Sequence, residues 1–214
     1  MSQRQIPDSG YSSETKNKIL DEALKLFALR GFSGVSVRDI AKAVGIKTSS
    51  LYNYYESKDA LLEDILMRFE NGYWHYFDWL TERNQKANSL EELMDNMINK
   101  EIIDMNDPLG CLGISLVIKE QHNNESVRRR ALDLFWGHSI KSLQADFDRL
   151  VEKGVTPRTD TKMIAIILLF TIFGINDMRL HQYAGLPPAV DLQETYAGLK
   201  KLLAIVLSHD SIVK

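Results

Sequence analysis

A cluster of hydrogen-bonding side chains occupies residues 47–54, in the stretch KTSSLYNY. Hydroxyl and amide groups can pair with base edges or phosphates, and tyrosines can bond phosphates or lie against thymine methyl groups. The mixture is too polar for a core helix and too aromatic for an ordinary solvated loop. Its residue types therefore favour recognition through hydrogen bonds on an exposed surface.

The remaining sequence carries no pattern that indicates a reaction. We find no G-x-S-x-G, no H-E-x-x-H, no glycine-rich phosphate loop and no C-x-x-C, and the five histidines are scattered. We therefore expect no enzyme, no metal and no cofactor. Cys111 is the single cysteine, so an intrachain disulfide is impossible and a reducing, cytoplasmic location is expected.

Apolar residues follow helical spacing along most of the 214 residues, and no alternating strand of useful length is found, so an all-α fold is predicted. Residues 13–30 form the first predicted helix. Ser36 is a candidate N-cap of the second, with Asp39 completing a capping box, and Gly45 suits its left-handed end. A third, short helix begins at Lys47 or Thr48. Ser57 is expected to cap a long fourth helix.

Two short helices joined by a glycine turn behind a supporting helix predict a helix-turn-helix. The second of them can enter the major groove of double-stranded DNA, which is wide enough to admit a helix. The charge distribution favours this interpretation. Residues 1–58 hold nine Lys+Arg and six Asp+Glu, net +3, whereas residues 59–214 hold 17 and 23, net −6.

The segment SVRDIAKAVGIKTSSLYNYYESKDALL, residues 36–62, resembles the TetR family of bacterial transcriptional regulators, whose pattern reads S-V-R-D-I-A-x-x-x-G-V-S-x-x-x-L-Y-x-Y-F-x-S-K-x-x-L. The resemblance implies an architecture of about nine helices. A three-helix DNA-binding domain at 13–58 would be joined through a long helix to a ligand-binding and dimerisation domain at 59–214. Residues 1–12 are expected to be a disordered leader.

The resemblance also implies which side chains meet DNA. Arg38 is placed to reach bases or phosphates, and Lys58 to hold a phosphate. Lys47 and Ser49 depart from the family pattern, which leaves the base code open and would move capping to Thr48. For Tyr52 and Tyr54 the alternative is packing against the first helix. The predicted DNA-binding residues are Arg38, Lys47, Thr48, Ser49, Ser50, Tyr52, Asn53, Tyr54 and Lys58.

Aromatic and methionine residues are frequent beyond residue 70, which is typical of an apolar cavity with a few polar anchors. In the family such a cavity binds an inducer, and an apolar or aromatic small molecule is the expected effector. The alternative is that these residues form ordinary core. The predicted ligand-binding residues are Tyr73, Trp74, Phe77, Met97, Cys111, Trp136, Phe170, Phe173 and Asn176.

The last two predicted helices carry more apolar surface than one chain can cover, so a homodimer through them is expected, with Leu199, Leu203 and Val206 on one face. The uninterrupted apolar run 163–175 is too short to span a membrane. The expected function is a repressor released from a palindromic operator when ligand shifts the fourth helix. Two alternatives stay open: a body that binds another protein, and a helical module whose helix-turn-helix is vestigial.

Overall fold

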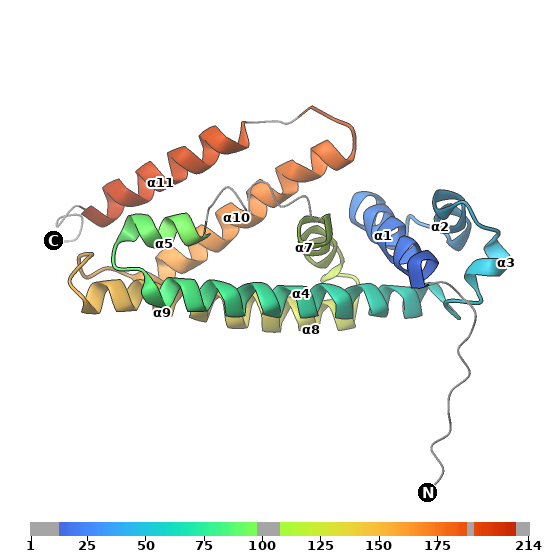
Figure 1. The fold of residues 1–214 in the computed structure, drawn as a ribbon, viewed down its shortest axis with the longest axis horizontal. Helices are drawn as coiled ribbons and strands as arrows, with labels where there is room; N and C mark the ends of the chain where they lie inside the picture. The colour runs from blue at the N-terminus through green and yellow to red at the C-terminus, as the bar shows by residue number, and fades with distance from the viewer. Residues whose placement is uncertain (1–12, 98–107, 188–190, 209–214) are drawn as a thin grey trace, which may run out of the picture.

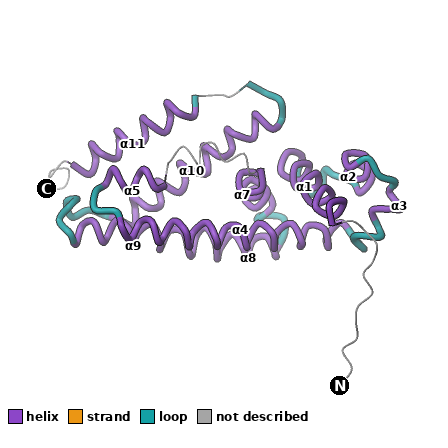
Figure 2. The backbone as a smooth tube through the Cα atoms, viewed as in Figure 1, coloured by secondary structure: helices purple, strands orange, loops and turns teal. Residues whose placement is uncertain are grey.

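The computed structural model describes residues 13–97, 108–187 and 191–208, and within these ranges every regular element is helical (Figure 2). The predicted all-α class is therefore confirmed. The predicted leader, residues 1–12, lies outside the described residues.

Three helices gather at one end of the molecule (Figure 1): α1 (Ser13–Arg30), α2 (Val37–Val44) and α3 (Thr48–Leu51). The capping box of α2 is confirmed, because Ser36 Oγ accepts from Asp39 N at 3.2 Å and Asp39 Oδ2 accepts from Ser36 N at 2.8 Å. Gly45 ends α2 with φ +83°, a conformation that side chains other than glycine rarely adopt.

The cap of α3 differs from the expectation. Lys47 occupies the N-cap position in extended conformation and its side chain makes no capping hydrogen bond, whereas the sequence predicted that capping would shift to Thr48. Thr48 is already helical, so its hydroxyl lies one position too far along the chain to accept from the first amides.

Helix α4 (Lys58–Lys86) runs from α3 along the length of the molecule (Figure 1). Ser57 Oγ accepts from Ala60 N at 3.0 Å, which confirms the predicted cap. Helix α5 (Leu90–Met97) follows, and α7 (Pro108–Glu120) crosses α4 steeply, since Figure 1 views it nearly end-on beside α1.

The crossing of α7 over α4 depends on a glycine. A Cβ added at Gly113 would lie 2.1 Å from Phe69 Cδ2, well inside van der Waals contact. Only a residue without a side chain leaves room for the Phe69 ring in this position. The crossing therefore brings α7 against both α1 and α4.

The next segment was predicted as one long helix and is continuous, but it changes its winding. It consists of α8 (Glu125–Ala131), a π-helical segment η1 (Leu132–Ser139) and α9 (Ile140–Glu152). The wider π turn leaves room for Ser139 Oγ to donate to Leu134 O at 2.8 Å. Gly154 ends the segment with φ +69°, as its position predicted.

Two apolar helices complete the fold, α10 (Thr161–Tyr183) and α11 (Leu192–Ser208). Within the described ranges, Thr161–Leu180 is long and apolar enough to cross a membrane, with a mean hydropathy of 1.8 and 44% of its most apolar window buried. The apolar run 163–175 is shorter, as the sequence indicated, because the longer stretch also includes the charged residues Lys162, Asp177 and Arg179. The exposed positions of α10 include three large apolar side chains, Met163, Ile167 and Phe170.

Candidate nucleic-acid interface and ligand cavity

The predicted DNA-binding residues lie on α2, on and directly around α3, and at the start of α4. The most accessible of them are Arg38, Lys47, Ser49, Tyr52 and Asn53, which are exposed. Thr48, Ser50, Tyr54 and Lys58 are partly buried. Tyr52 is 53% exposed, which is a large fraction for an aromatic side chain.

The inner side of the same segment fixes its orientation. Leu51 and Tyr55 are buried, at 2% and 6% exposure. Tyr55 donates its hydroxyl to Asp64 Oδ2 on α4 at 2.7 Å, and Lys16 of α1 pairs with the same oxygen at 2.9 Å. Tyr54 packs partly against the core, in line with the alternative given for the tyrosines, whereas Tyr52 does not. The recognition surface is therefore supported by both α1 and α4.

Lys58 has contacts within the chain that the sequence did not indicate. Its Nζ donates to Phe32 O at 2.8 Å and to Val35 O at 2.9 Å, and it lies 4.1 Å from the centroid of the Phe32 ring. An ammonium group has three N–H donors, so these contacts leave one for any phosphate. Lys58 therefore ties the α1–α2 loop to the start of α4.

Helix α7 of the body also holds the α1–α2 loop. Glu120, at the end of α7, is buried and its Oε1 accepts from Phe32 N at 2.8 Å. The neighbouring Lys119 donates to Ala28 O of α1 at 2.7 Å. We call Phe32, Lys58 and Glu120 the Phe32 junction. It connects both α4 and α7 of the body to the DNA-facing helices.

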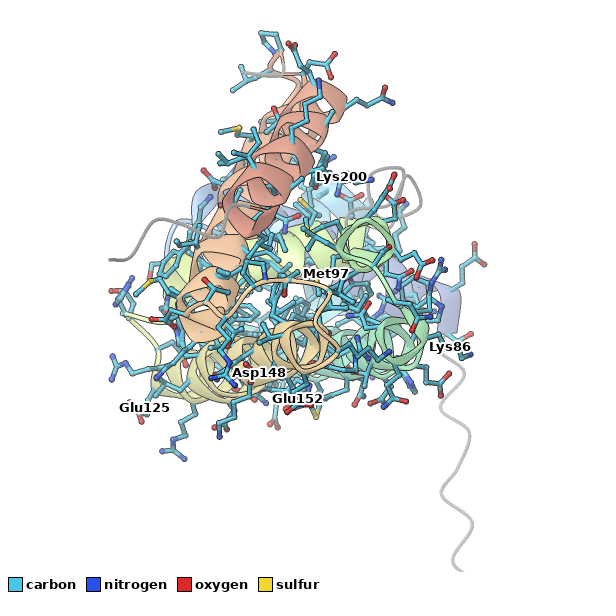
Figure 3. All side chains as sticks on the ribbon, turned by 90° about the vertical axis from the view of Figure 1, so that its left-hand side faces the viewer. Lys86, Met97, Glu125, Asp148, Glu152 and Lys200 are labelled. Atoms are coloured by element: carbon cyan, nitrogen blue, oxygen red, sulfur yellow. The ribbon has the colours of Figure 1, made fainter. Side chains whose placement is uncertain are left out.

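A cavity of about 170 Å³ lies in the body, bounded mainly by α4, α7 and α10 and closed by residues of α5, α9 and α11. Met97 lies on its wall, and Figure 3, which looks along the molecule from the end opposite α3, places Met97 in the interior between the helices. Six predicted ligand-binding residues line the cavity: Tyr73, Phe77, Met97, Cys111, Phe173 and Asn176.

The other three predicted residues do not line the cavity. Phe170 is 56% exposed and lies on the outer side of α10. Trp136 contacts both Phe170, at 5.3 Å between ring centroids, and the cavity-lining Phe173, at 5.9 Å, but is not itself part of the wall. Trp74 packs edge-on against His138 at 4.5 Å. The helices that carry these three residues line or flank the cavity, but the three side chains are not part of its wall.

Polar residues that the sequence did not single out also line the cavity. They are Tyr76 of α4, Arg179 of α10 and Tyr196 of α11. Tyr76 lies within the aromatic stretch 73–79, and Tyr196 lies on the apolar line of the last helix. Nothing local distinguishes them, since their shared position depends on how α4, α10 and α11 pack. In the described part of the chain, no group of three or more His, Cys, Asp or Glu could hold a metal.

An exposed recognition helix, a capped helix before it and a helical body around an apolar cavity together define a helix-turn-helix DNA-binding protein. Residues 19–65 match the family model described as bacterial regulatory proteins, tetR family. Residues 19–65 therefore form a DNA-binding domain of the TetR family. The matched range runs past residue 58, where the sequence placed the domain boundary.

Relatives with assigned functions match part of the chain. The transcriptional repressor KstR2 of Rhodococcus jostii is 42% identical over 62 residues, which cover 29% of this chain and 30% of KstR2. IcaR of Staphylococcus epidermidis, a negative transcriptional regulator of a biofilm operon, is 27% identical over 119 residues, 56% of this chain and 62% of IcaR. The chain therefore spans less than two thirds of the length of either relative.

Solved structures resemble the whole fold. The regulator PfmR of Thermus thermophilus is 18% identical with a TM-score of 0.61, over 94% of this chain and all of PfmR. A Saccharomonospora viridis protein in complex with choline is 18% identical with a TM-score of 0.64, over 95% and 100% of the two chains. At these identities the similarity establishes the fold alone.

Proposed function

We propose that the protein is a homodimeric transcriptional repressor that releases a palindromic DNA operator when a small apolar or aromatic molecule binds in its body. The observation that carries the proposal is the recognition surface on α3, exposed within a domain that matches the TetR family over residues 19–65. KstR2 and IcaR are both repressing regulators, which supports repression rather than activation.

The exposed residues divide by the kind of DNA contact they suit. Asn53 and Ser49 carry short polar groups that can pair with base edges in the major groove. Lys47 and Arg38 carry cations that suit phosphates, and Arg38 can also pair with guanine. The remaining donor of Lys58 suits a phosphate beside them. Base contacts would supply the sequence preference and phosphate contacts the salt dependence.

A second copy of the chain is the partner that the uncovered apolar surface fits. On α10, Met163, Ile167 and Phe170 are about half exposed at helical spacing, and on α11 Leu202 and Ile205 are each 58% exposed. A two-fold axis between these helices would bury the stripes against their copies. The recognition helices should then lie about 34–36 Å apart, or a multiple of that spacing.

The predicted dimer face needs one correction. Leu199 and Leu203 are buried within this chain, at 9% and 6% exposure, so they pack inside the monomer. The side chain of Val206 lies outside the described residues. The apolar surface left for a partner consists of the neighbouring positions Leu202 and Ile205 instead.

Transmission from the cavity to DNA has two routes in this proposal. Helix α4 lines the cavity and leads directly to α3, as the sequence indicated. Helix α7 lines the cavity with Gly110, Cys111 and Ile114, and its last residue holds Phe32 in the Phe32 junction. A ligand that prefers one placement of these helices lowers operator affinity by its difference in affinity between the two states.

The test begins with selection of a binding sequence from random DNA by the purified protein, followed by salt-titrated binding curves. Asn53→Ala should weaken binding to the selected sequence by roughly 1–3 kcal/mol per half-site if Asn53 reads a base, and affect random DNA less. Lys47→Ala should weaken both alike and reduce the slope of log affinity against log salt by about 0.9 per lost contact. Lys201→Ala, an exposed lysine of α11, is the matched control and should change neither.

Two outcomes separate the alternatives. No salt-dependent DNA binding by the wild-type protein would favour a vestigial helix-turn-helix. Sequence-specific binding that no small molecule alters would favour a body that binds another protein, despite the cavity.

A further inference from the structure

The cavity has one polar end, and its polar groups come from four helices. Arg179 and Asn176 belong to α10, Tyr196 to α11, Tyr76 to α4 and Cys111 to α7. The remaining wall is formed by apolar or aromatic side chains, with Phe69, Phe77 and Phe173 from α4 and α10 among them. A molecule that fills this space therefore meets a polar end and an apolar body.

The polar end contains one cationic side chain. Arg179 is the one charged side chain among the described residues that line the cavity. Burial raises the pKa of Tyr196, and burial raises the pKa of the Cys111 thiol to about 11. The guanidinium of Arg179 opposes both shifts, so its positive charge lies close to α11 and to α7 at once. Asp177 acts on Cys111 as well, but its side chain is exposed and is not part of the wall.

Two phenols add neutral donors beside this charge. Burial raises the pKa of Tyr76, with Tyr196 nearby, and burial also raises that of Tyr196, so both hydroxyls stay protonated at neutral pH. Neither hydroxyl has a hydrogen-bond partner among the described residues. Tyr73 lines the same cavity, but its hydroxyl is paired with Ser139 Oγ at 2.7 Å. Tyr76 and Tyr196 can therefore donate to a bound molecule where Tyr73 is already engaged.

We propose that the effector is a carboxylate with a compact apolar body, its head group bound by Arg179, Tyr76 and Tyr196 and its body held among Phe69, Phe77 and Phe173. The identification rests on the proposed function, since it names the ligand class of the same cavity. A guanidinium has five N–H donors, so Arg179 keeps its present interactions in the chain and still donates to a carboxylate. A quaternary ammonium suits aromatic walls but is repelled by Arg179.

The volume of the cavity restricts the size of the ligand's apolar part. A cavity of about 150 Å³ lined by aliphatic and aromatic residues holds one benzene molecule. The present cavity is about 170 Å³, so it fits a single ring with a short acid arm. Phenylacetate is a probe of that size, and phenylacetamide and benzyltrimethylammonium match it with a neutral and a cationic head.

The experiment measures the affinity of the three probes for the full chain by calorimetry, and in parallel their effect on binding to the selected DNA. Phenylacetate should bind about tenfold or more tightly than phenylacetamide, because a charged hydrogen-bonded pair is lost in the amide. Arg179→Gln should remove that difference and leave the amide affinity unchanged. Tyr76→Phe and Tyr196→Phe should each weaken phenylacetate binding roughly threefold to tenfold. Arg129→Gln, at an exposed arginine of α8 away from the cavity, is the matched control for Arg179→Gln and should leave the preference for the carboxylate intact.

The two proposals fail in different ways. The proposal of a carboxylate effector is overturned if the amide or the ammonium binds as tightly as phenylacetate or more tightly. It is also overturned if phenylacetate does not bind at millimolar concentration. Release of DNA by the neutral probe without a carboxylate preference overturns the ligand class and supports the regulator. Carboxylate binding with the expected variant pattern but no effect on DNA supports the ligand class and overturns ligand-controlled release. Thermal melting of each free variant confirms that the substitutions leave the fold intact.

Discussion

The crossing of α7 over α4 at Gly113 makes a stability prediction whose size follows from the structure. In Gly113→Ala the new Cβ would lie 2.1 Å from Cδ2 of Phe69, 2.7 Å from Cε2 and 2.8 Å from Cγ. Carbon atoms in contact are about 3.5–4.0 Å apart, so ring or helix must move by roughly 1.4 Å, the difference between about 3.5 Å and the closest distance.

Overpacking of this kind costs about 1–3 kcal/mol, and the value should fall at the upper end because the ring is buried on a crossing helix. The better helix propensity of alanine offsets about 0.5–1 kcal/mol of the loss. We therefore expect Gly113→Ala to lower the free energy of unfolding by about 2 kcal/mol. Gly110→Ala on the same helix is the control, because a methyl group there would meet no atom of another element within 4 Å. It should leave stability unchanged or raise it by up to about 1 kcal/mol.

A double-mutant cycle tests the cause. Phe69→Ala removes the ring and costs about 3–5 kcal/mol by itself. In the double variant the Gly113→Ala methyl group has room, so only the helix-propensity gain should remain and the interaction energy should be about 2.5–3 kcal/mol. The assay is urea unfolding followed by circular dichroism at one protein concentration, since the stability of a dimer depends on concentration. Costs that add to within about 0.5 kcal/mol would refute the reasoning.

Three further predictions concern single residues. Leu202→Glu should dissociate the proposed dimer in sedimentation experiments while the monomer stays folded, whereas Leu203→Glu should unfold the chain; the reverse pattern would contradict the assignment of the two faces. Lys58→Met should lower the unfolding free energy without DNA by about 2 kcal/mol, because two carbonyls lose a charged donor; a lysine that only met phosphate would leave it unchanged. The hydrogen bonds from Ser36 hold the pKa of Asp39 below its ordinary 3.8, so its stabilisation is present above that pH and is lost as the pH falls through the lower folded value. Acid titration of Asp39→Asn should lack that component, and an unchanged acid response would count against it.

Local features of the fold could be predicted because each depends on neighbours in sequence. The capping box at Ser36 and Asp39, the left-handed Gly45 and the cap at Ser57 all appear where their spacing placed them. The recognition surface could be predicted for the same reason. Leu51 and Tyr55 lie four residues apart and point inward, so residues between them are left facing solvent. The π-helical segment η1 had no such signal, and its residues were predicted as ordinary α-helix.

Two features of the body could not be predicted from the sequence. Helix α11 has apolar residues on two neighbouring stripes, Leu199 with Leu203 and Leu202 with Ile205, and periodicity cannot tell which stripe meets its own chain. The cavity presents the same difficulty. Arg179 and Tyr196 line the same cavity only through the tertiary arrangement of α10 and α11, so neither could be assigned to the cavity from its own segment.

The Phe32 junction has a consequence for anyone who builds hybrid sensors by joining the DNA-reading half of this protein to a foreign body. Cutting the chain before Lys58 separates Phe32 from both groups that hold its peptide, since Lys58 and Glu120 lie on the other side of the cut. The transplanted half would keep its recognition residues, but its α1–α2 loop would lose the hydrogen bonds that hold it in place. A working hybrid must therefore carry Lys58 along and supply a carboxylate where Glu120 now lies.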